Sequence, residues 1–564
     1  MKVIIGLIFL LALLDSFSQE GKKVQFIGGA RSLISQTGFS SDDSDTVTPR
    51  KSTGGYALID LGIKINPNSN TEILGMMRIK NDFGGFWGGG VTFDVRQIQV
   101  KGVAGNVVRY QIGNIDYKLS PYTFYNHNPD LLVSSFSTNR IKEDVLNYES
   151  FYKNNNTWRQ QGAAADFALK FPKGIKEMKF NGFITRLNPT NFTNILERFF
   201  GGGNVVVNQS KYLTLGVNHV STFDLKQTAL TDNAYRNNVT SLTYDASWTN
   251  DKIKIGIDGE SGFSSSYSTQ NMEGKLSDYF VHVKGTAQLK KLGLNVKLGY
   301  MDNGPDFRSF GAQSKRMDFN QVNGFYERYT NEQIIRPLSY YDLYNDPSLY
   351  SAGISTRIMA INPAINNVLP YGVATFNRRG IYMGSSFSDK KKIVAFDATY
   401  YRLQEIRGQG TFQLRTFHYL NTTLKIDFSN WLKWKKKQVF QLGLAYQKTN
   451  RKSEFDFETI RLNSLTANAG FEFEIVENLS VLGNAFLFQS SGNETEAVRN
   501  ASGEIVNFNQ MTIDGIENSF SGGIKFSFTK DVYLAAFYES NSNSYNLAAP
   551  YRLNQLMIYY IMKF

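Results

Sequence analysis

The chain has 564 residues and no cysteine, which excludes disulfides, thiolate metal sites and a cysteine nucleophile. Lys and Arg outnumber Asp and Glu by 61 to 49, but no aromatic–basic binding module accompanies the net charge of +12, so we expect no nucleic-acid partner. Aromatic residues make up 14% of the chain although its mean hydropathy is negative. A chain of this length without disulfides must be held together by extensive backbone pairing or a large core.

Residues 1–18 predict a cleaved secretory signal peptide. Lys2 supplies a positive charge, residues 3–14 are apolar without interruption, and Ser16 and Ser18 occupy the small-residue positions before the cut. The apolar run is too short for a membrane-spanning helix, and no cysteine follows the cut to carry a lipid anchor. We therefore expect an exported mature chain that begins at Gln19.

Apolar and polar residues alternate along many segments of the mature chain, as the two faces of a strand require. The clearest alternation covers residues 242–248, 253–260, 279–290, 294–300 and 465–475. Stretches rich in Gly, Pro, Asn and Asp predict tight turns at residues 66–70, 104–106, 172–174, 249–251, 388–392, 476–478 and 529–531. Longer polar stretches predict loops at residues 37–53, 122–158, 189–203, 264–277 and 302–380. Short turns that alternate with long loops are typical of the hairpins of a membrane barrel.

The last strand of the chain is apolar along one face. Counting back from Phe564 in steps of two gives Met562, Tyr560, Ile558 and Leu556, and side chains two positions apart share a face. An apolar last strand that ends on Phe resembles the C-terminal signal by which assembly machinery recognises bacterial outer-membrane β-barrels. The whole mature chain thus resembles outer-membrane β-barrels of porin or channel type. Its cleavage context and its Tyr-, Asn- and Lys-rich strands look like those of Bacteroidota proteins.

The predicted fold is all-β: a single transmembrane antiparallel β-barrel over residues 19–564, with about 20 strands and a range of roughly 16 to 22. Successive strands of such a barrel must run in opposite directions, and this requires one more strand near residues 205–238 than the alternation shows. A soluble sandwich would need domain linkers and a solenoid would need a fixed repeat, and neither is visible. A TonB-dependent transporter is not expected, because the strand-like pattern starts near Val24 and leaves no room for a plug domain. The resemblance implies outer-membrane lipids and the barrel-assembly machinery as partners.

The densest basic run, Trp431–Lys437, links two predicted strands. Trp beside Lys suits a turn at the membrane interface, where the cations attract anionic lipid head groups. A dedicated binding site is the alternative interpretation of this run.

Charged residues on the polar strand faces are the first candidate functional site. They would line the lumen, where charge selects the solutes that pass, or they would simply pair with one another and hold water. The candidates are Arg78, Arg109, Lys252, Lys254, Asp258, Glu260, His282, Lys284, Lys297, Lys425 and Asp427.

The long stretch from Asp302 to Gly380 is the second candidate. Loops of this length are usually functional or disordered, and its many Ile, Leu and Tyr residues argue against disorder. An amphipathic helix is conceivable near residues 331–343, although Pro337 would kink or divide it. The stretch could constrict the lumen from inside or form a docking surface outside.

An enzyme is not expected, and neither a cofactor nor a metal is predicted. The four histidines, His127, His219, His282 and His418, lie in different predicted elements without an HExxH or GxSxG motif. Two functions remain. The first is a channel for small polar or anionic solutes. The second is a docking subunit of a secretion or barrel-assembly complex, with a plugged lumen and loops that bind surface lipoproteins or another barrel.

Overall fold

The computed structural model describes residues 23–41, 50–83, 91–127, 137–144, 148, 158–231, 233–269, 271–314, 364, 367–408, 410–499, 505–546 and 548–564. The predicted signal peptide, residues 1–18, and the conceivable helix near residues 331–343 lie outside these described residues.

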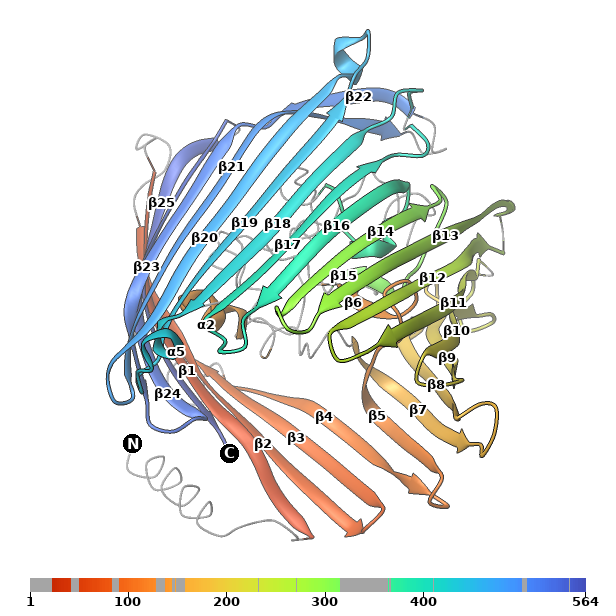
Figure 1. The fold of residues 1–564 in the computed structure, drawn as a ribbon, viewed down its shortest axis with the longest axis horizontal. Helices are drawn as coiled ribbons and strands as arrows, with labels where there is room; N and C mark the ends of the chain where they lie inside the picture. The colour runs from red at the N-terminus through yellow and green to blue at the C-terminus, as the bar shows by residue number, and fades with distance from the viewer. Residues whose placement is uncertain are drawn as a thin grey trace.

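Twenty-two strands close into one antiparallel β-barrel (Figure 1). The first half of the wall comprises β1 (Val24–Ser41), β2 (Arg50–Asn68), β3 (Thr71–Asp82), β4 (Val91–Ala104), β5 (Val108–Tyr117), β7 (Trp158–Lys170), β8 (Glu177–Asn188), β9 (Glu197–Asn208), β10 (Leu213–Leu225), β11 (Tyr235–Thr249) and β12 (Ile253–Ser268). The second half comprises β13 (Asn271–Leu289), β14 (Leu294–Asn303), β16 (Arg378–Ser388), β17 (Val394–Gln404), β18 (Thr416–Asp427), β19 (Gln438–Arg451), β20 (Ile460–Val476), β21 (Leu479–Arg499), β23 (Gly515–Ser527), β24 (Val532–Tyr545) and β25 (Ala548–Lys563).

The barrel closes where its last strand meets its first. β25 pairs with β1 in antiparallel register from Gly29 opposite Lys563 to Ser41 opposite Tyr551. The terminal Phe564 extends this seam, because its backbone N–H donates to the Gly28 carbonyl at 3.0 Å and its carbonyl accepts from Gly28 at 2.8 Å. Closure removes the free edges that an open sheet would present.

The predicted barrel is confirmed, and its strand number lies at the upper limit of the predicted range. β10 supplies the crossing that alternation did not show near residues 205–238. Three predicted loops were wrong in part. Residues 264–277 belong almost entirely to β12 and β13, and β9 begins at Glu197 within the predicted loop 189–203. The ends of the predicted loop 37–53, residues 37–41 and 50–53, belong to β1 and β2. Polar strand ends rich in Ser and Asn resemble a loop in the sequence, because they lack the apolar alternation that marks a strand with one buried face.

Among the described residues, one further strand of the same sheet lies outside the barrel. β22 (Ile505–Thr512) pairs with the outer part of β21, from Asn493 to Arg499, while the inner part of β21 pairs with β23. This hairpin extends the wall on the side of the long connections (Figure 1).

The last strand is apolar on both faces, with different surroundings. Leu556 is exposed, and Ile558, Tyr560, Met562 and Phe564 on the same face are half-buried. The residues between them, Met557, Tyr559 and Ile561, are buried on the inner face. The predicted role of the outer stripe as an assembly signal stays a prediction.

Short connections gather at one end of the barrel and long ones at the other (Figure 1). At the short-turn end, Asp427 caps the one-turn helix α5 (Phe428–Leu432) by accepting a hydrogen bond from the Asn430 N–H at 3.0 Å. Trp431 and Trp434 in this basic turn are 60% and 55% exposed, as an interface turn requires. Among the described residues, no helix is both long and apolar enough to cross a bilayer.

Candidate functional site

Parts of two long connections lie inside the barrel. From the β5–β7 connection come residues 118–127, 137–144 and 148, called the inner segment below; they include β6 (Tyr125–His127) and α2 (Thr138–Asp144). From the β14–β16 connection come residues 304–314 and 367–377, with β15 (Ala312–Ser314) and the 3-10 turn η4 (Gly372–Ala374). β6 and β15 pair in parallel as a small separate sheet.

The inner segment identifies the inner face of the wall, because it contacts opposite sides of the barrel. At one end Ser120 donates to Glu260 on β12 at 2.5 Å. At the other end Thr138 and Ser521 on β23 share a hydrogen bond of 2.6 Å, and Asn139 donates to Asn484 on β21 at 3.1 Å. A segment that reaches both walls in this way runs through the interior (Figure 1).

One end of the inner segment is fixed by a buried charged network. Asp60 on β2, fully buried, accepts from Arg78 Nε at 2.8 Å and from Arg96 Nη1 at 2.6 Å. The Tyr148 hydroxyl donates to the same carboxylate at 2.7 Å. The guanidinium carbons of Arg31 and Arg96 lie 3.8 and 3.9 Å from the centroid of the Tyr148 ring, a cation–π geometry. Three wall arginines thus hold one tyrosine of the inner segment.

A second carboxylate belongs to this network. Arg31 pairs with Asp144 of α2 at 2.8 Å, so the printed ion pairs link Arg31, Arg78 and Arg96 to Asp60 and Asp144. Tyr148 stays protonated, because burial and the neighbouring Asp60 carboxylate raise its pKa above the ordinary tyrosine value. Its hydroxyl therefore remains a donor and adds no negative charge.

The opposite end of the inner segment is fixed by aromatic packing. Tyr122 stacks on Phe280 of β13 with ring centroids 4.1 Å apart, and Phe124 stacks on Phe183 of β8 at 4.9 Å. Phe124 also meets Phe200 edge to face at 4.8 Å. These rings belong to a buried cluster that includes Ile115, Val220, Val239, Phe307, Phe310, Tyr371 and Phe376. The two connections therefore share one dry core with the wall from β5 to β13.

Aromatic side chains also form a row across the inner wall. Tyr382 on β16 stacks on His282 of β13 at 5.7 Å and on Tyr401 of β17 at 4.9 Å, and Tyr401 stacks on Tyr419 of β18 at 6.1 Å. The row can cross β14 because Gly299 stands there: a Cβ at Gly299 would lie 2.2 Å from the Tyr382 ring. The Tyr382 hydroxyl and His282 Nε2 share a hydrogen bond of 2.8 Å.

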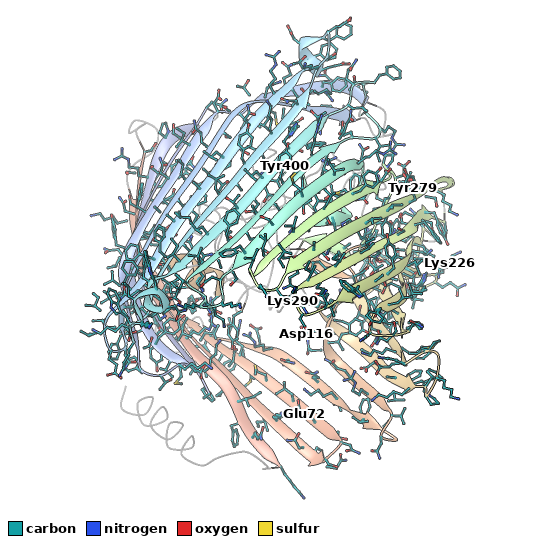
Figure 2. The ribbon with its side chains drawn as sticks, in the orientation of Figure 1. Glu72, Asp116, Lys226, Tyr279, Lys290 and Tyr400 are labelled. Carbon is teal, nitrogen blue, oxygen red and sulfur yellow. The ribbon has the colours of Figure 1, made fainter. Side chains whose placement is uncertain are left out.

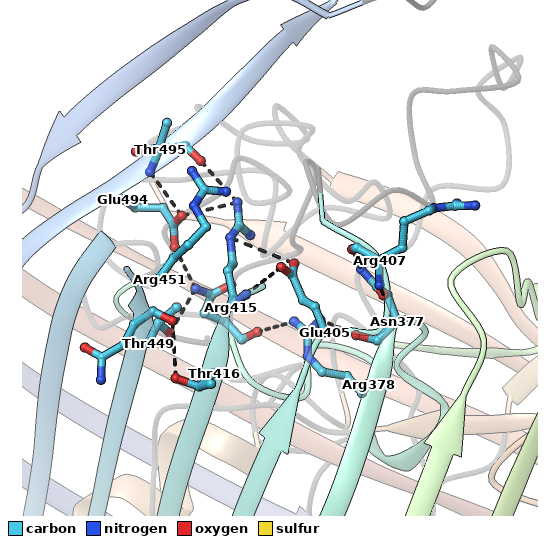
Figure 3. A network of polar contacts seen from close by, with 12 residues as sticks. Asn377, Arg378, Glu405, Arg407, Arg415, Thr416, Thr449, Arg451, Glu494 and Thr495 are labelled. Atoms are coloured by element: carbon cyan, nitrogen blue, oxygen red, sulfur yellow. Dashed lines mark hydrogen bonds and ion pairs between the residues drawn. The ribbon is translucent and has the colours of Figure 1, made fainter. Parts of the chain in front are cut away.

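A second charged network fixes the β14–β16 connection (Figure 3). Arg378, fully buried, donates to the carbonyls of Asn367 and Val368 at 2.9 and 3.0 Å. The Asn367 amide donates to Glu494 at 2.8 Å, and Arg415 lies 3.3 Å from the same carboxylate. Arg378, Arg415 and the neighbouring Arg451 lie beside the carboxylates of Glu405 and Glu494, and Glu458 faces Arg451 as well, so the described charges of this network balance.

A cavity of about 600 Å³ lies at the short-turn mouth, between α2 and the ends of β20 to β25. Its cationic lining consists of Arg140, Lys525, Lys530 and Lys563. Its acidic lining consists of Asp144, Glu472 and Asp531. Asp144 is paired with Arg31 at 2.8 Å, and Glu472 is paired with Lys437 at 2.7 Å and with Lys525 at 2.9 Å.

The predicted lumen residues lie on or beside the inner face but do not form one cluster. Arg78 belongs to the Tyr148 network, Glu260 binds Ser120 and Ser241, His282 belongs to the aromatic row, and Asp258 pairs with Lys284 at 2.9 Å. Arg109 pairs with Asp166 near the short-turn end, with Nε 2.6 Å from Oδ2. The remaining candidates are Lys252 in a turn, Asp427 in the α5 cap, and Lys254, Lys297 and Lys425, whose register positions are on the inner face.

Ion pairs also occur at the short-turn rim. Glu72, labelled in Figure 2, accepts from Lys64 at 2.7 Å and from Lys101 at 2.8 Å across β2, β3 and β4. In contrast, Lys254, Lys297 and Lys425 form no ion pair with any residue that the structure describes.

Sequence reasoning missed the residues that hold the inner segments, above all Asp60, Arg96 and Tyr148. One signal existed: Asp60 is the lone charge in the otherwise apolar run from Tyr56 to Ile63, and an unpaired buried carboxylate is too costly to persist. The partners themselves, up to 88 positions away, leave no local pattern.

Within the described part of the chain, no group of three or more His, Asp or Glu residues is placed to hold a metal ion. No protein-family model and no curated protein matches the chain. Among solved structures, it is similar to OccK5 (OpdH) of Pseudomonas aeruginosa, at 11% identity over 96% of this chain and 98% of that chain, with a TM-score of 0.32. It is also similar to a BenF-like porin from Pseudomonas fluorescens Pf-5, at 8% identity over 96% and 99%, with a TM-score of 0.35, and to OccAB4 of Acinetobacter baumannii, at 10% over 97% and 100%, with 0.30. At these identities and TM-scores, the solutes that those proteins carry indicate nothing about a solute of this chain.

Proposed function

We propose that the chain is an outer-membrane channel that passes small polar or anionic solutes through a barrel narrowed by its own long connections. The observation that carries the proposal is a set of lysines on the inner face, Lys254, Lys297 and Lys425, that form no ion pair with a described residue. Fixed charge in a narrow aqueous path attracts the opposite ion and repels its own.

Some charged residues of the wall are held in ion pairs and others are not. Arg78 forms an ion pair with Asp60, whereas Lys254, Lys297 and Lys425 make no ion pair with a described residue. Their ammonium groups are therefore the wall charges that a passing anion would meet. We assign them the main role in selectivity, with Lys252 at the rim as a lesser contributor.

A direct test is single-channel recording of the mature protein in a planar bilayer under a KCl gradient. The reversal potential should show a preference for chloride, and the K254Q/K297Q/K425Q variant should reduce that preference severalfold. The charge-matched control K390Q/K391Q/K435Q, with exposed lysines in the short turns, should leave it unchanged. Cation preference in the unmodified protein, or equal effects of both variants, would overturn the assignment.

A plugged docking subunit is the second candidate, and the dry core between the two connections and the wall from β5 to β13 favours it. Barrels of 22 strands are wide enough to need internal filling, and here the connections supply it. Its partners would be surface lipoproteins or another barrel. Silence in the bilayer from protein shown to be folded by heat-modifiable migration, with open steps only after deletion of residues 315–363, would select this candidate.

We further infer that the chain reaches the outer membrane through the secretory route, with residues 1–18 removed, and that barrel-assembly machinery inserts it by its last strand. The short-turn end would face the periplasm and the long connections the outside. The composition of the strands supports a Bacteroidota-like origin. We assign no catalytic role and no cofactor to the chain. Sequencing the N-terminus of the outer-membrane form tests the cut before Gln19.

A further inference from the structure

Three basic residues lie directly opposite one another on three neighbouring strands. Arg402 on β17 is the register partner of His418 on β18, and His418 is the partner of Lys448 on β19. Adjacent strands are about 4.8 Å apart, so the row is compact. On β20, Arg461 is two residues from Asn463, the partner of Lys448, which makes it a diagonal neighbour of the row.

The row is on the outer face of the barrel. On the same strands Leu403, Phe417 and Thr449 are buried against the interior, and residues next to them in sequence point the opposite way. Arg402 and Arg461 are exposed, while His418 and Lys448 are half-buried.

Among the described residues, no acid pairs with these cations. The residues that flank the row, Ile381 opposite Arg402 and Asn463 opposite Lys448, are both uncharged. Within the described residues, no ion pair involves Arg402, Lys448 or Arg461, whereas nearby Arg379 is paired with Asp302 at 2.8 Å. Arg402 and Lys448 each lie opposite His418, on the two strands that flank it. Two cations that no described acid offsets make the row a position where an external anion would stabilise the wall.

The height of the row matches a head-group region. From His418 to Asp427 the strand runs nine residues to the α5 turn with its exposed Trp431 and Trp434. Nine residues cover about 30 Å along a strand and about 23 Å of height at a tilt of about 40°, close to the apolar band of such barrels, about 25 Å. The row and the Trp turn thus lie at opposite boundaries of one band.

The surface between these boundaries is apolar and begins with aromatic rings. Immediately below the row, Tyr400 and Tyr446 hold their hydroxyls toward it, at 2.7 Å from His418 and 3.2 Å from Asn463. Met383 and Leu444 follow on the same outer face and are 52% and 37% exposed. A ligand that fits this surface would therefore carry an anionic group such as a phosphate at the row, and hydrocarbon along the apolar surface between the row and the Trp turn.

We propose that Arg402, His418 and Lys448, with Arg461, form a binding site for a phosphorylated lipid of the outer leaflet. The guanidinium fork of Arg402 suits two oxygens of one phosphate, and the acyl chains would lie along the apolar outer face below. A soluble phosphate would use only the upper half of this surface, so the lipid is the favoured occupant. The site does not depend on whether the lumen conducts.

The test is native mass spectrometry of the full mature protein in neutral detergent, titrated with lipid A, which carries phosphomonoesters on its sugars. Relative to the unmodified protein, R402Q/K448Q should raise the apparent Kd about tenfold, because two charge-assisted contacts are lost. The control K391Q/K435Q removes the same charge from exposed short-turn lysines and should change the Kd less than twofold. Heat-modifiable migration verifies that each variant is folded.

Several results would overturn the proposal: no lipid A binding by the unmodified protein, equal weakening by both variants, or equal binding of lipid A stripped of its phosphates. Displacement of the lipid by inorganic phosphate at comparable concentration would show that the site binds a soluble phosphate and not the lipid. A second readout follows from the repulsion within the row: in phosphatidylcholine vesicles without lipid A, R402Q/K448Q should be at least as resistant to urea as the unmodified protein. Lower resistance there would mean that the row is structural.

Discussion

The two ends of the inner segment are attached to the wall by opposite physical means. At Phe124 and Tyr122 the attachment is dry, made of stacked rings that are almost completely buried. At Tyr148 it is polar, with three arginines and one fully buried carboxylate gathered around a single ring. Ring packing loses stability in proportion to the apolar surface removed, whereas a buried charged network fails all at once when one charge is left uncompensated. The polar end should therefore be the more fragile one, and the one that responds to pH.

The largest effect is expected from Asp60→Asn. It leaves Arg78 and Arg96 buried without their carboxylate, and breaking a buried pair costs about 3–5 kcal/mol. Urea unfolding in lipid vesicles measures the loss, and single-channel recordings should show larger or noisier steps as the inner segment loosens. Asp82→Asn is the matched control, because Asp82 pairs with Lys80 at 2.8 Å while 60% exposed, and it should cost less than about 1 kcal/mol. Equal costs would contradict the distinction between buried and exposed pairs.

Phe124→Ala tests the dry end. Removing a ring that packs between Phe183 and Phe200 should lower the free energy of unfolding by about 3 kcal/mol, as for other large-to-small changes in cores. The loss should be the same at pH 8 and pH 11, since no charge is involved. Phe412→Ala, at a fully exposed ring, serves as the control and should be close to neutral. A loss that varied with pH would mean that the two ends are coupled.

Tyr148→Phe isolates the alkaline response of the polar end. At pH 8 it should cost about 1.5 kcal/mol, the value of one hydrogen bond to a charged group. Because the pKa of Tyr148 is raised in the folded protein, the unfolded chain gives up this proton first as pH rises. The contribution of the tyrosine is therefore complete below its ordinary pKa, about 10, and declines above it. The difference between the two proteins in urea should narrow from pH 8 to pH 11, and a constant difference would contradict the shift.

The contrast between the two ends also shows what the sequence could predict. Strand alternation and turn composition are local, so the alternating parts of β11 to β14 and β20, and the apolar face that ends at Phe564, were predictable. The bulge between Met76 and Met77 was not, because it depends on the pairing partner. It shifts the register of β4 after Arg96 and reverses the alternation that follows.

The attachments of the inner segment were not predictable for a related reason. Asp60 lies 36 positions from Arg96 and 88 from Tyr148, and the three meet only when β2, β3 and β4 are paired and the inner segment is packed against them. Several predicted lumen residues proved instead to be paired among themselves, as Asp258 is with Lys284. Sequence shows which face a charge occupies, while its availability to a solute depends on contacts between distant strands.

Arg109→Gln should have the smallest effect, although it breaks an ion pair of the same chemistry as that of Arg78. Arg109 donates to Asp166 at 2.6 Å, but its side chain is 72% exposed whereas that of Arg78 is 5% exposed. Water screens the rim pair and solvates either partner when the other is removed, so the free energy of unfolding should change by less than about 0.5 kcal/mol in the same urea assay. A cost near that of Asp60→Asn would show that the rim is as dry as the interior, and the division of the wall into screened and buried charge would have to be redrawn.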